Sequence, residues 1–276
     1  MTTTSAYRHI YLSPHIDDAA LSCGGAIYQQ TQANESVLVL TIFAADPPRK
    51  TPISSYAQRM HDSWGNFESM VATRRAEDRA SMAVLGVDYR HLNFVDCIYR
   101  GEPEQGRWYY LNNTQLFGQV HPDDAHLAQA LVSTITGIVE PGDETVLYAP
   151  LTVGNHIDHQ LTHRAALDLG QQGWMVVFYE DYPYTDPGYP LSTTTVKEES
   201  RYSLANTLAA KTDLGLRPEL RYLTEEAIAA KIESIAAYAS QMQMLFGGEA
   251  AMANHVRAYA LRVGEGQLAE RIWRFG

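Results

Sequence analysis

Two short clusters of histidine and aspartate lie far apart in the sequence, and both carry residue types that bind metal ions. One is Pro14-His15-Ile16-Asp17-Asp18, and the other is His156-Ile157-Asp158-His159. Imidazole nitrogen and carboxylate oxygen both suit zinc, and a catalytic zinc site needs three protein ligands and an open position for water. His15 and Asp18, three residues apart in a turn, can bind a single ion. A histidine of the second cluster would complete the ligand set.

Asp17 comes from the same turn but points elsewhere, so it can stay off the metal and accept a proton from bound water. A general base must lie within hydrogen-bond reach of that water. The alternative is that Asp17 and Asp18 cap the following helix and that His15 is a solvated loop residue.

The second cluster leaves several arrangements open. One histidine could bind the ion, and another could face the substrate carbonyl with a carboxylate fixing its tautomer. His159 and His163 are four residues apart, so on a helix they share a face. That pair could supply two ligands by itself, or His163 could be a buried structural residue.

The elements around both clusters follow the order of an α/β fold. Residues 8–13 form a short strand-like run, and residues 19–32 suit a helix with one buried face. Residues 36–44 are almost continuously apolar, which is typical of a strand buried on both faces. This βαβ unit implies a parallel sheet. The pattern then repeats loosely, with helices expected at 56–85, 122–139 and 157–169 and strands at 89–94, 145–149 and 174–179.

This alternation predicts one Rossmann-like, doubly wound α/β domain over residues 1–276, with a mostly parallel sheet. The tail from about Glu225 holds helical segments, such as residues 227–246, that we expect to pack back onto the domain. Both clusters follow directly on a strand. In open α/β sheets ligands bind outside the carboxyl ends of the strands, so the clusters lie where a site is expected.

Two loops rich in aromatic residues, at 99–113 and 179–189, also follow expected strands. Their rings could stack on the faces of sugars. They could equally cover the core or form a subunit contact, and a homo-oligomer is compatible with this sequence.

Composition limits the classes of partner and location. The net charge is −11, and no block of lysine and arginine appears, which argues against nucleic acid or an anionic membrane. No apolar run approaches the roughly 20 residues that span a bilayer, and the N-terminus lacks the features of a signal peptide. The two cysteines, Cys23 and Cys97, suggest neither a disulfide framework nor a cysteine-based zinc site. The cytoplasm is the expected location.

Together, these residues resemble the PIG-L/LmbE-like deacetylase family, which includes the N-acetylglucosaminyl-phosphatidylinositol de-N-acetylases and the mycothiol- and bacillithiol-pathway deacetylases. The first cluster is similar to the family's His-Pro-Asp-Asp-Glu signature after strand one, and the second to its His-x-Asp-His motif. Two stretches between them are similar to its Arg-x-x-Glu…Leu-Gly helix and its Phe-x-Asp strand end: Arg74-Arg75-Ala76-Glu77 leading into Ala83-Val84-Leu85-Gly86, and Asn93-Phe94-Val95-Asp96.

The resemblance implies a role for each matching residue. It implies a divalent metal, Zn²⁺ or another ion such as Fe²⁺, and Asp17 as general base. His156 would stabilise the oxyanion and protonate the leaving amine, with Asp158 orienting it. Arg74 and Asp96 would line or support the substrate pocket, and His163 would be supporting or structural. The implied metal ligands are His15, Asp18 and His159.

The sequence departs from the family pattern in three places. Ile16 replaces the usual proline and Ala19 the usual glutamate, neither of which is an implied ligand. Some members also carry a tyrosine just before the second motif, where this chain has Val153-Gly154-Asn155. A second match, His121-Pro122-Asp123-Asp124, spells the signature more literally but follows no clear strand. Proline at the first helical position and aspartate in the first turn are ordinary helix-start chemistry, so we assign it a capping role.

The function expected from both motifs is removal of an N-acetyl or other acyl group from an amino-sugar-containing small molecule or glycoconjugate. One alternative is a metal-dependent amidase or hydratase of the same superfamily acting on a non-sugar compound. A more distant one is a non-catalytic, Rossmann-like binding module, but neither a Gly-x-Gly-x-x-Gly nor a Walker pattern follows any expected strand.

Overall fold

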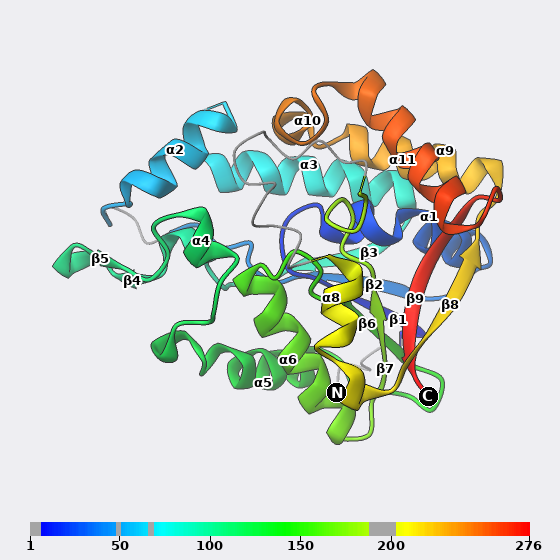
Figure 1. Cartoon of the computed structure of the whole chain (residues 1–276), viewed down its shortest axis with the longest axis horizontal. Coiled ribbons are helices and arrows are strands. Elements are labelled where there is room, and N and C mark those ends of the chain that lie inside the picture. The colour runs from blue at the N-terminus through cyan, green and yellow to red at the C-terminus, as the bar shows by residue number, and fades with distance from the viewer. Residues whose placement is uncertain (1–6, 48–50, 66–68, 188–202) are drawn as a thin grey trace, which may run out of the picture.

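A seven-stranded sheet forms the centre of the part of the chain that the computed structural model describes, residues 7–47, 51–65, 69–187 and 203–276 (Figure 1). Its strand order is β3-β2-β1-β6-β7-β9-β8. The first five strands in this order are parallel, whereas β9 pairs antiparallel with both β7 and β8. The bounds are β1 (His9–Ser13), β2 (Val37–Thr41), β3 (Asp88–His91), β6 (Val146–Pro150), β7 (Met175–Tyr179), β8 (Leu216–Tyr222) and β9 (Ala269–Phe275).

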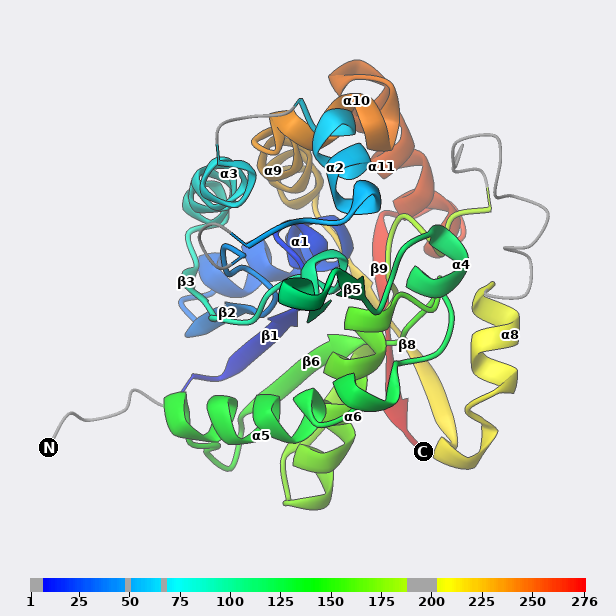
Figure 2. The same ribbon diagram turned by 90° about the vertical axis from the view of Figure 1, so that its left-hand side faces the viewer.

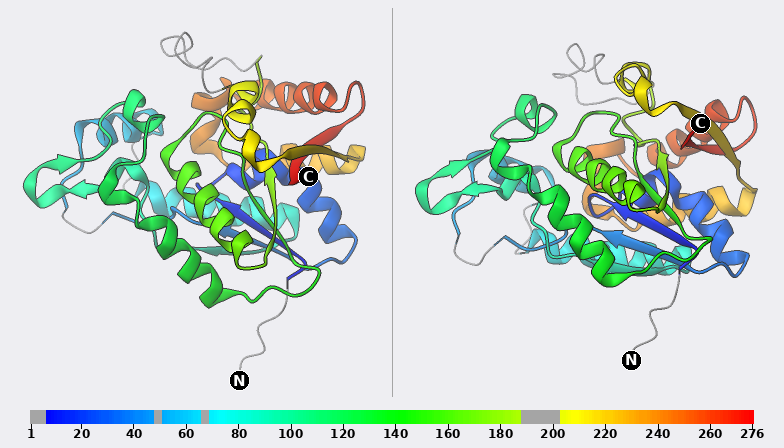
Figure 3. Two further views of the ribbon diagram at one scale, coloured as in Figure 1. Left: turned by 60° about the horizontal axis from the view of Figure 1, so that its bottom comes forward. Right: turned by 90° about the horizontal axis from the view of Figure 1, so that it is seen from below.

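Helices cover both faces of this sheet (Figure 2). One face carries α1 (Asp18–Gln32), α3 (Met70–Leu85) and α9 (Glu225–Ala236), with α10 (Ala239–Phe246) and α11 (Glu249–Val263) beside them. The opposite face carries α5 (Leu127–Ile138) and α6 (Ile157–Gln171), which lie in front of the strands when the molecule is seen from below (Figure 3). Shorter elements are α2 (Ser55–Ser63), α4 (Asn113–Leu116), α8 (Leu204–Ala209), the hairpin β4 (Gly101–Glu102) and β5 (Arg107–Trp108), and the 3₁₀ turns Cys97–Tyr99, Pro103–Gln105, Pro122–Asp124 and Thr212–Leu214.

Strand β1 shows how the two faces are filled. Successive side chains of a strand point to opposite faces. Ile10 and Leu12 therefore belong to the core under α5 and α6, while Tyr11 belongs to the core under α1, α3 and α9. All three are fully buried. A strand covered on both sides must be apolar throughout, which explains the continuous apolar runs in the sequence.

The expected fold class is confirmed, with corrections to single elements. The helix expected at 122–139 begins only at Leu127, after the 3₁₀ turn Pro122–Asp124. The single helix expected at 56–85 is wrong. Helix α2 ends at Ser63, Gly65 has φ +103°, and α3 starts afresh at Met70 with the Ser69 side chain accepting from the Ala72 amide. Glycine at positive φ and a new serine cap both interrupt a helix.

The C-terminal tail does pack back onto the domain through helices, but it also extends the sheet. Strands β8 and β9 were not predicted from the sequence, because charged residues interrupt their apolar pattern. In β9 these charges are paired: buried Glu270 contacts Lys231, and Arg271 contacts Glu180. No helix among the described residues is long and apolar enough to cross a membrane.

Candidate metal and catalytic site

The two histidine–aspartate clusters meet at the carboxyl ends of β1 and β6. These strands are neighbours and run parallel, so the turn into α1 and the turn into α6 lie at the same edge of the sheet. An oxygen of Asp18, Oδ2, lies 3.2 Å from His15 Nδ1 and 3.2 Å from His159 Nε2. Ser13 holds the first turn, because its hydroxyl donates to the His15 carbonyl and accepts from the Ala19 amide. The expected convergence of the two clusters is confirmed.

The donor set fits a divalent ion. Ligand atoms of His15, His156 and His159 lie within 4.8 Å of one another. The Nε2 atom of His159 is buried and makes no hydrogen bond, so it is the ring atom that an ion would contact. In a tetrahedral site with bonds of about 2.0–2.1 Å, neighbouring ligand atoms are separated by about 3.3 Å. The two distances from Asp18 to the histidines match that spacing.

His15 and His159 each have a second carboxylate on the other ring nitrogen. His159 Nδ1 lies 2.6 Å from Asp181 Oδ1, and the other oxygen of Asp181 accepts from the Val153 amide. His15 Nε2 lies 3.0 Å from Asp158 Oδ2. Such partners fix the tautomer and leave the remaining nitrogen available for a metal. The two remaining ring nitrogens, His15 Nδ1 and His159 Nε2, both face Asp18.

The electrostatics of the site also favour a cation. Burial lowers the pKa of His159, but the Asp18 and Asp181 carboxylates outweigh it and raise the pKa to about 9. Burial would raise the pKa of Asp18, yet the neighbouring His159 and His15 hold it well below its usual range. These acidic groups therefore attract positive charge to the position between the two clusters.

Asp17 is held apart from this cluster by an unusual backbone. Its φ is +151°, a conformation that costs a residue with a side chain about 1–3 kcal/mol. One carboxylate oxygen lies 3.3 Å from an Arg74 nitrogen, which also donates to the Ile16 carbonyl. Burial raises the pKa of Asp17 to about 7, although Arg74 opposes the shift. A carboxyl group with a pKa near neutrality suits proton transfer.

His156 and Asp158 make different contacts from those that the sequence analysis assigned. Nδ1 of His156 accepts from the Asp158 backbone amide at 3.2 Å, which leaves the ring proton on Nε2. No hydrogen bond joins the Asp158 carboxylate to the His156 ring. It contacts His15, the Cys97 amide and the Arg100 guanidinium instead. Burial, together with the charge on His15, keeps the pKa of His156 well below its usual range.

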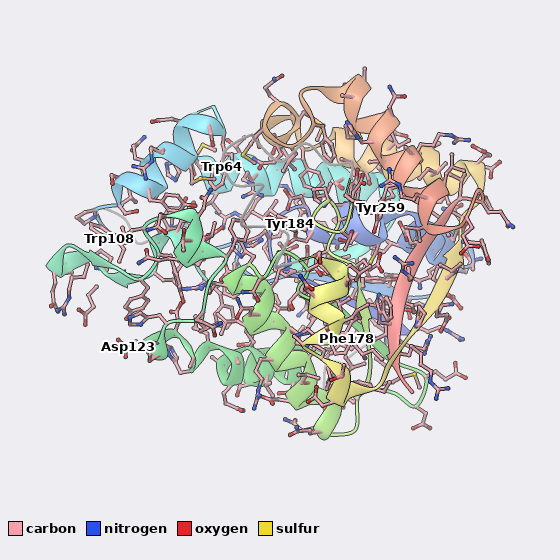
Figure 4. All side chains as sticks on the ribbon, viewed as in Figure 1. Trp64, Trp108, Asp123, Phe178, Tyr184 and Tyr259 are labelled. Carbon is pink, nitrogen blue, oxygen red and sulfur yellow. The ribbon has the colours of Figure 1, made fainter. Side chains whose placement is uncertain are left out.

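A pocket opens beside these residues, and both Arg74 and Asp96 line it. Asp96 Oδ2 lies 3.8 Å from His15 Nε2, so the pocket adjoins the candidate metal position. Trp64, which is labelled in Figure 4, forms part of its wall, and the Arg74 guanidinium lies 5.1 Å from that ring. The lining residues are Ile16, Phe43, Ala45, Trp64, Met70, Val71, Arg74, Asp96 and Tyr99.

The family known as GlcNAc-PI de-N-acetylase (PIG-L) matches residues 10–169 of the chain. This segment begins in β1, ends in α6 and contains both clusters. The chain belongs to this family.

Named relatives of this PIG-L family chain are deacetylases. A 2'-N-acetylparomamine deacetylase from Niallia circulans is 30% identical over 186 residues, which cover 63% of this chain and 66% of the relative. The same-named protein from Streptomyces fradiae is 32% identical over 181 residues, covering 64% and 57%. The chain thus spans less than two thirds of the curated relatives it matches. The zinc-inhibited form of teicoplanin deacetylase Orf2 is 28% identical, with 96% of each chain covered and a TM-score of 0.74.

Three parts of this PIG-L site were not found from the sequence. Asp181 follows β7, so an acidic residue just after an expected strand was the available signal. Arg100 lies in the aromatic stretch at 99–113 and carried no motif. Tyr184 lies in the other aromatic loop, and its ring centre is 6.2 Å from that of His159 (Figure 4). That loop was expected to run to Tyr189, and residues 188 and 189 lie outside the described residues.

His163 takes the structural role that the sequence left open. Its Nδ1 bonds the Pro150 carbonyl at 2.8 Å, and its ring packs 4.4 Å from that of Phe178. Burial lowers its pKa to about 3. Among the described residues, no group of clustered ligand atoms includes His163. The alternative of a metal site formed by His159 and His163 alone is therefore not supported.

Proposed function

We propose that this chain is a metal-dependent hydrolase that removes an N-acetyl group from an amino-sugar-containing small molecule or glycoconjugate. The observation that supports it best is the shared contact of Asp18 with His15 and His159, which come from turns more than 140 residues apart. His15, Asp18 and His159 are the proposed ligands, and Zn²⁺ is the proposed ion, with Fe²⁺ as the other candidate. Nitrogen and carboxylate donors suit either metal.

The chemistry divides between the ion and the side chains. When bound, a divalent ion lowers the pKa of water toward about 7 and polarises the amide carbonyl. Asp17 takes a proton from the attacking water as the oxygen of that water adds to the carbonyl carbon. His156, neutral with its proton on Nε2, donates a hydrogen bond to the developing oxyanion. The C–N bond then breaks, acetate leaves, and the amine takes a proton.

That last proton is assigned to Asp17. The low pKa of His156 makes it a hydrogen-bond donor in its neutral form rather than a source of a full proton. Asp17, with a pKa near 7, can both accept the proton from water and return it to the amine. Arg74 supports this role because it fixes the carboxylate through a direct contact.

The substrate class is proposed from the pocket and the charge. Trp64, Tyr99 and Phe43 offer apolar and aromatic surface, while Arg74 and Asp96 offer groups that can bond hydroxyls. The net charge of −11 suits a neutral or cationic glycoside better than an anionic one. The relatives named for acetylparomamine and teicoplanin are consistent with an acetylated amino sugar. We also propose a cytoplasmic location.

The experiment is a metal-reconstitution assay. Metal-free protein would be loaded with Zn²⁺ or Fe²⁺, and acetate release would be measured on N-acetylglucosamine, an N-acetylated aminoglycoside and a glycopeptide that carries N-acetylglucosamine. Non-sugar N-acetyl amino acids serve as the comparison. We expect metal-dependent release from at least one sugar. Release from the non-sugar amides alone would favour an amidase, and no release with full metal occupancy would contradict the proposal.

A further inference from the structure

The segment His121-Pro122-Asp123-Asp124, for which the sequence predicts a capping role, also makes contacts that lead to the candidate metal site. It does form a 3₁₀ turn in which the His121 side chain accepts from the Asp123 amide. The two aspartates then diverge. The side chain of Asp123 is 69% exposed and lies at the outside of the molecule (Figure 4), whereas that of Asp124 is only 3% exposed.

Asp124 begins a line of contacts that ends at the candidate metal site. Its Oδ2 accepts from Arg100 Nε at 2.8 Å and from the Tyr110 hydroxyl at 2.8 Å. The same guanidinium places Nη1 at 2.6 Å from Asp158 Oδ1. Asp158 Oδ2 then lies 3.0 Å from His15 Nε2. These contacts therefore link four charged or ionisable groups from four separate segments in the order Asp124, Arg100, Asp158 and His15.

Asp124 does more than neutralise the charge of Arg100, because its contact with Nε also sets the direction of the guanidinium. A guanidinium is a rigid planar fork, so fixing Nε fixes the direction of both terminal nitrogens. The rings of Phe43 and Tyr110, at 5.0 and 5.7 Å, further confine the Arg100 group. Asp158 is fully buried, and a buried carboxylate needs a charged partner; Arg100 supplies that charge to Oδ1, which makes no hydrogen bond of its own. Arg100 is in turn held by Asp124 and by the Val95 carbonyl, so Asp124 is the charged group that sets the position of the guanidinium beside Asp158.

We propose that Asp124 is a positioning residue for the metal site, acting through Arg100 and Asp158 on the ring of His15. Asp158 orients His15 only while its own carboxylate is held by Arg100, and Arg100 is held by Asp124. The inference rests on the proposed function, because it takes His15 as a metal ligand. The competing explanation is that these ion pairs only stabilise the fold.

The test compares Asp124→Asn with Asp123→Asn. Both variants remove one carboxylate from the same turn, but only the first breaks the line of contacts. Metal affinity would be measured on metal-free protein by competition with a chromophoric chelator, and folding by thermal unfolding without metal. Loss of a partner behind a metal ligand weakens binding about 10–100-fold, and we expect about tenfold for Asp124→Asn and no change for Asp123→Asn.

A double-mutant cycle separates positioning from stability. If Asp124 acts through Asp158, Asp124→Asn has no further effect on metal affinity in an Asp158→Asn background. Additive losses of affinity would overturn the proposal, as would unchanged affinity in the single variant. Should Asp124→Asn fail to fold, Arg100→Lys keeps the buried charge but removes the fork, and the same tenfold loss is expected. A wild-type protein that binds no divalent ion would overturn the proposed function itself.

Discussion

The buried imidazole of His163 predicts a specific loss of stability in mild acid. Its pKa is lowered to about 3 because the folded protein keeps the ring out of water, and Lys211 adds to the effect. The unfolded chain has an ordinary histidine pKa of about 6.5. Above pH 6.5 both states are neutral, so the stability linked to His163 is fully present. As the pH falls below 6.5, His163 binds a proton in the unfolded state but not in the folded state, so the free energy of unfolding decreases.

The size of this loss follows from the two pKa values. Each pH unit between them is worth about 1.4 kcal/mol, so lowering the pH from 7.5 to 5.0 costs about 2 kcal/mol through His163 alone. The variant His163→Asn removes the titrating group. Its side-chain amide can still donate to the Pro150 carbonyl, as Nδ1 does in the wild type.

The assay is urea unfolding of metal-free protein at pH 7.5 and 5.0, for the wild type and for His163→Asn. Other groups titrate over this range, but they do so in both proteins. The decrease in unfolding free energy on acidification should be about 2 kcal/mol smaller in the variant. Equal decreases in the two proteins would show that burial does not lower the pKa of His163, however much the substitution lowers the unfolding free energy at pH 7.5.

Three further predictions follow from the contacts of the site and the core. Asp17→Asn should lower kcat about 10²–10⁴-fold while metal content stays that of the wild type, and activity and elemental analysis of the same sample check this. Asp181→Asn should weaken metal binding about 10–100-fold, because it removes the partner of His159 Nδ1; a chelator titration with unchanged affinity would show that Asp181 does not orient the ligand. Lys231→Met should lower the unfolding free energy by about 3–5 kcal/mol, because it leaves Glu270 charged and buried. Arg257→Met, which removes one partner of an exposed ion pair, serves as the control and should leave the unfolding free energy nearly unchanged in the same denaturant series.

The sequence predicted the part of the site that depends on local rules. His15 and Asp18 share one turn, and His159 follows another strand, so the rule that parallel strands end at one edge was enough to bring them together. The 121–124 segment was also predicted to start a turn, because proline at its first position follows a local rule, but the side chain that caps it is that of His121 rather than that of an aspartate.

What the sequence did not predict depends on pairing between distant segments. Asp181 orients His159 only because β7 lies next to β6. A single aspartate in a loop has no sequence pattern that indicates this contact. Asp158 holds His15 rather than the ring of His156 because Arg100 and the Cys97 amide fix its carboxylate, and both come from a stretch without a motif. The strand β9 was missed for a local reason, because charged residues interrupt its apolar pattern.

We expect one cation to bind between the two turns, and anomalous diffraction from crystals loaded with Zn²⁺ would locate it. One strong peak should lie within bonding distance of His15, Asp18 and His159, with Asp17 and His156 beside it but not bound to the metal. A peak on other residues, or none at a Zn²⁺ concentration that supports acetate release, would contradict it.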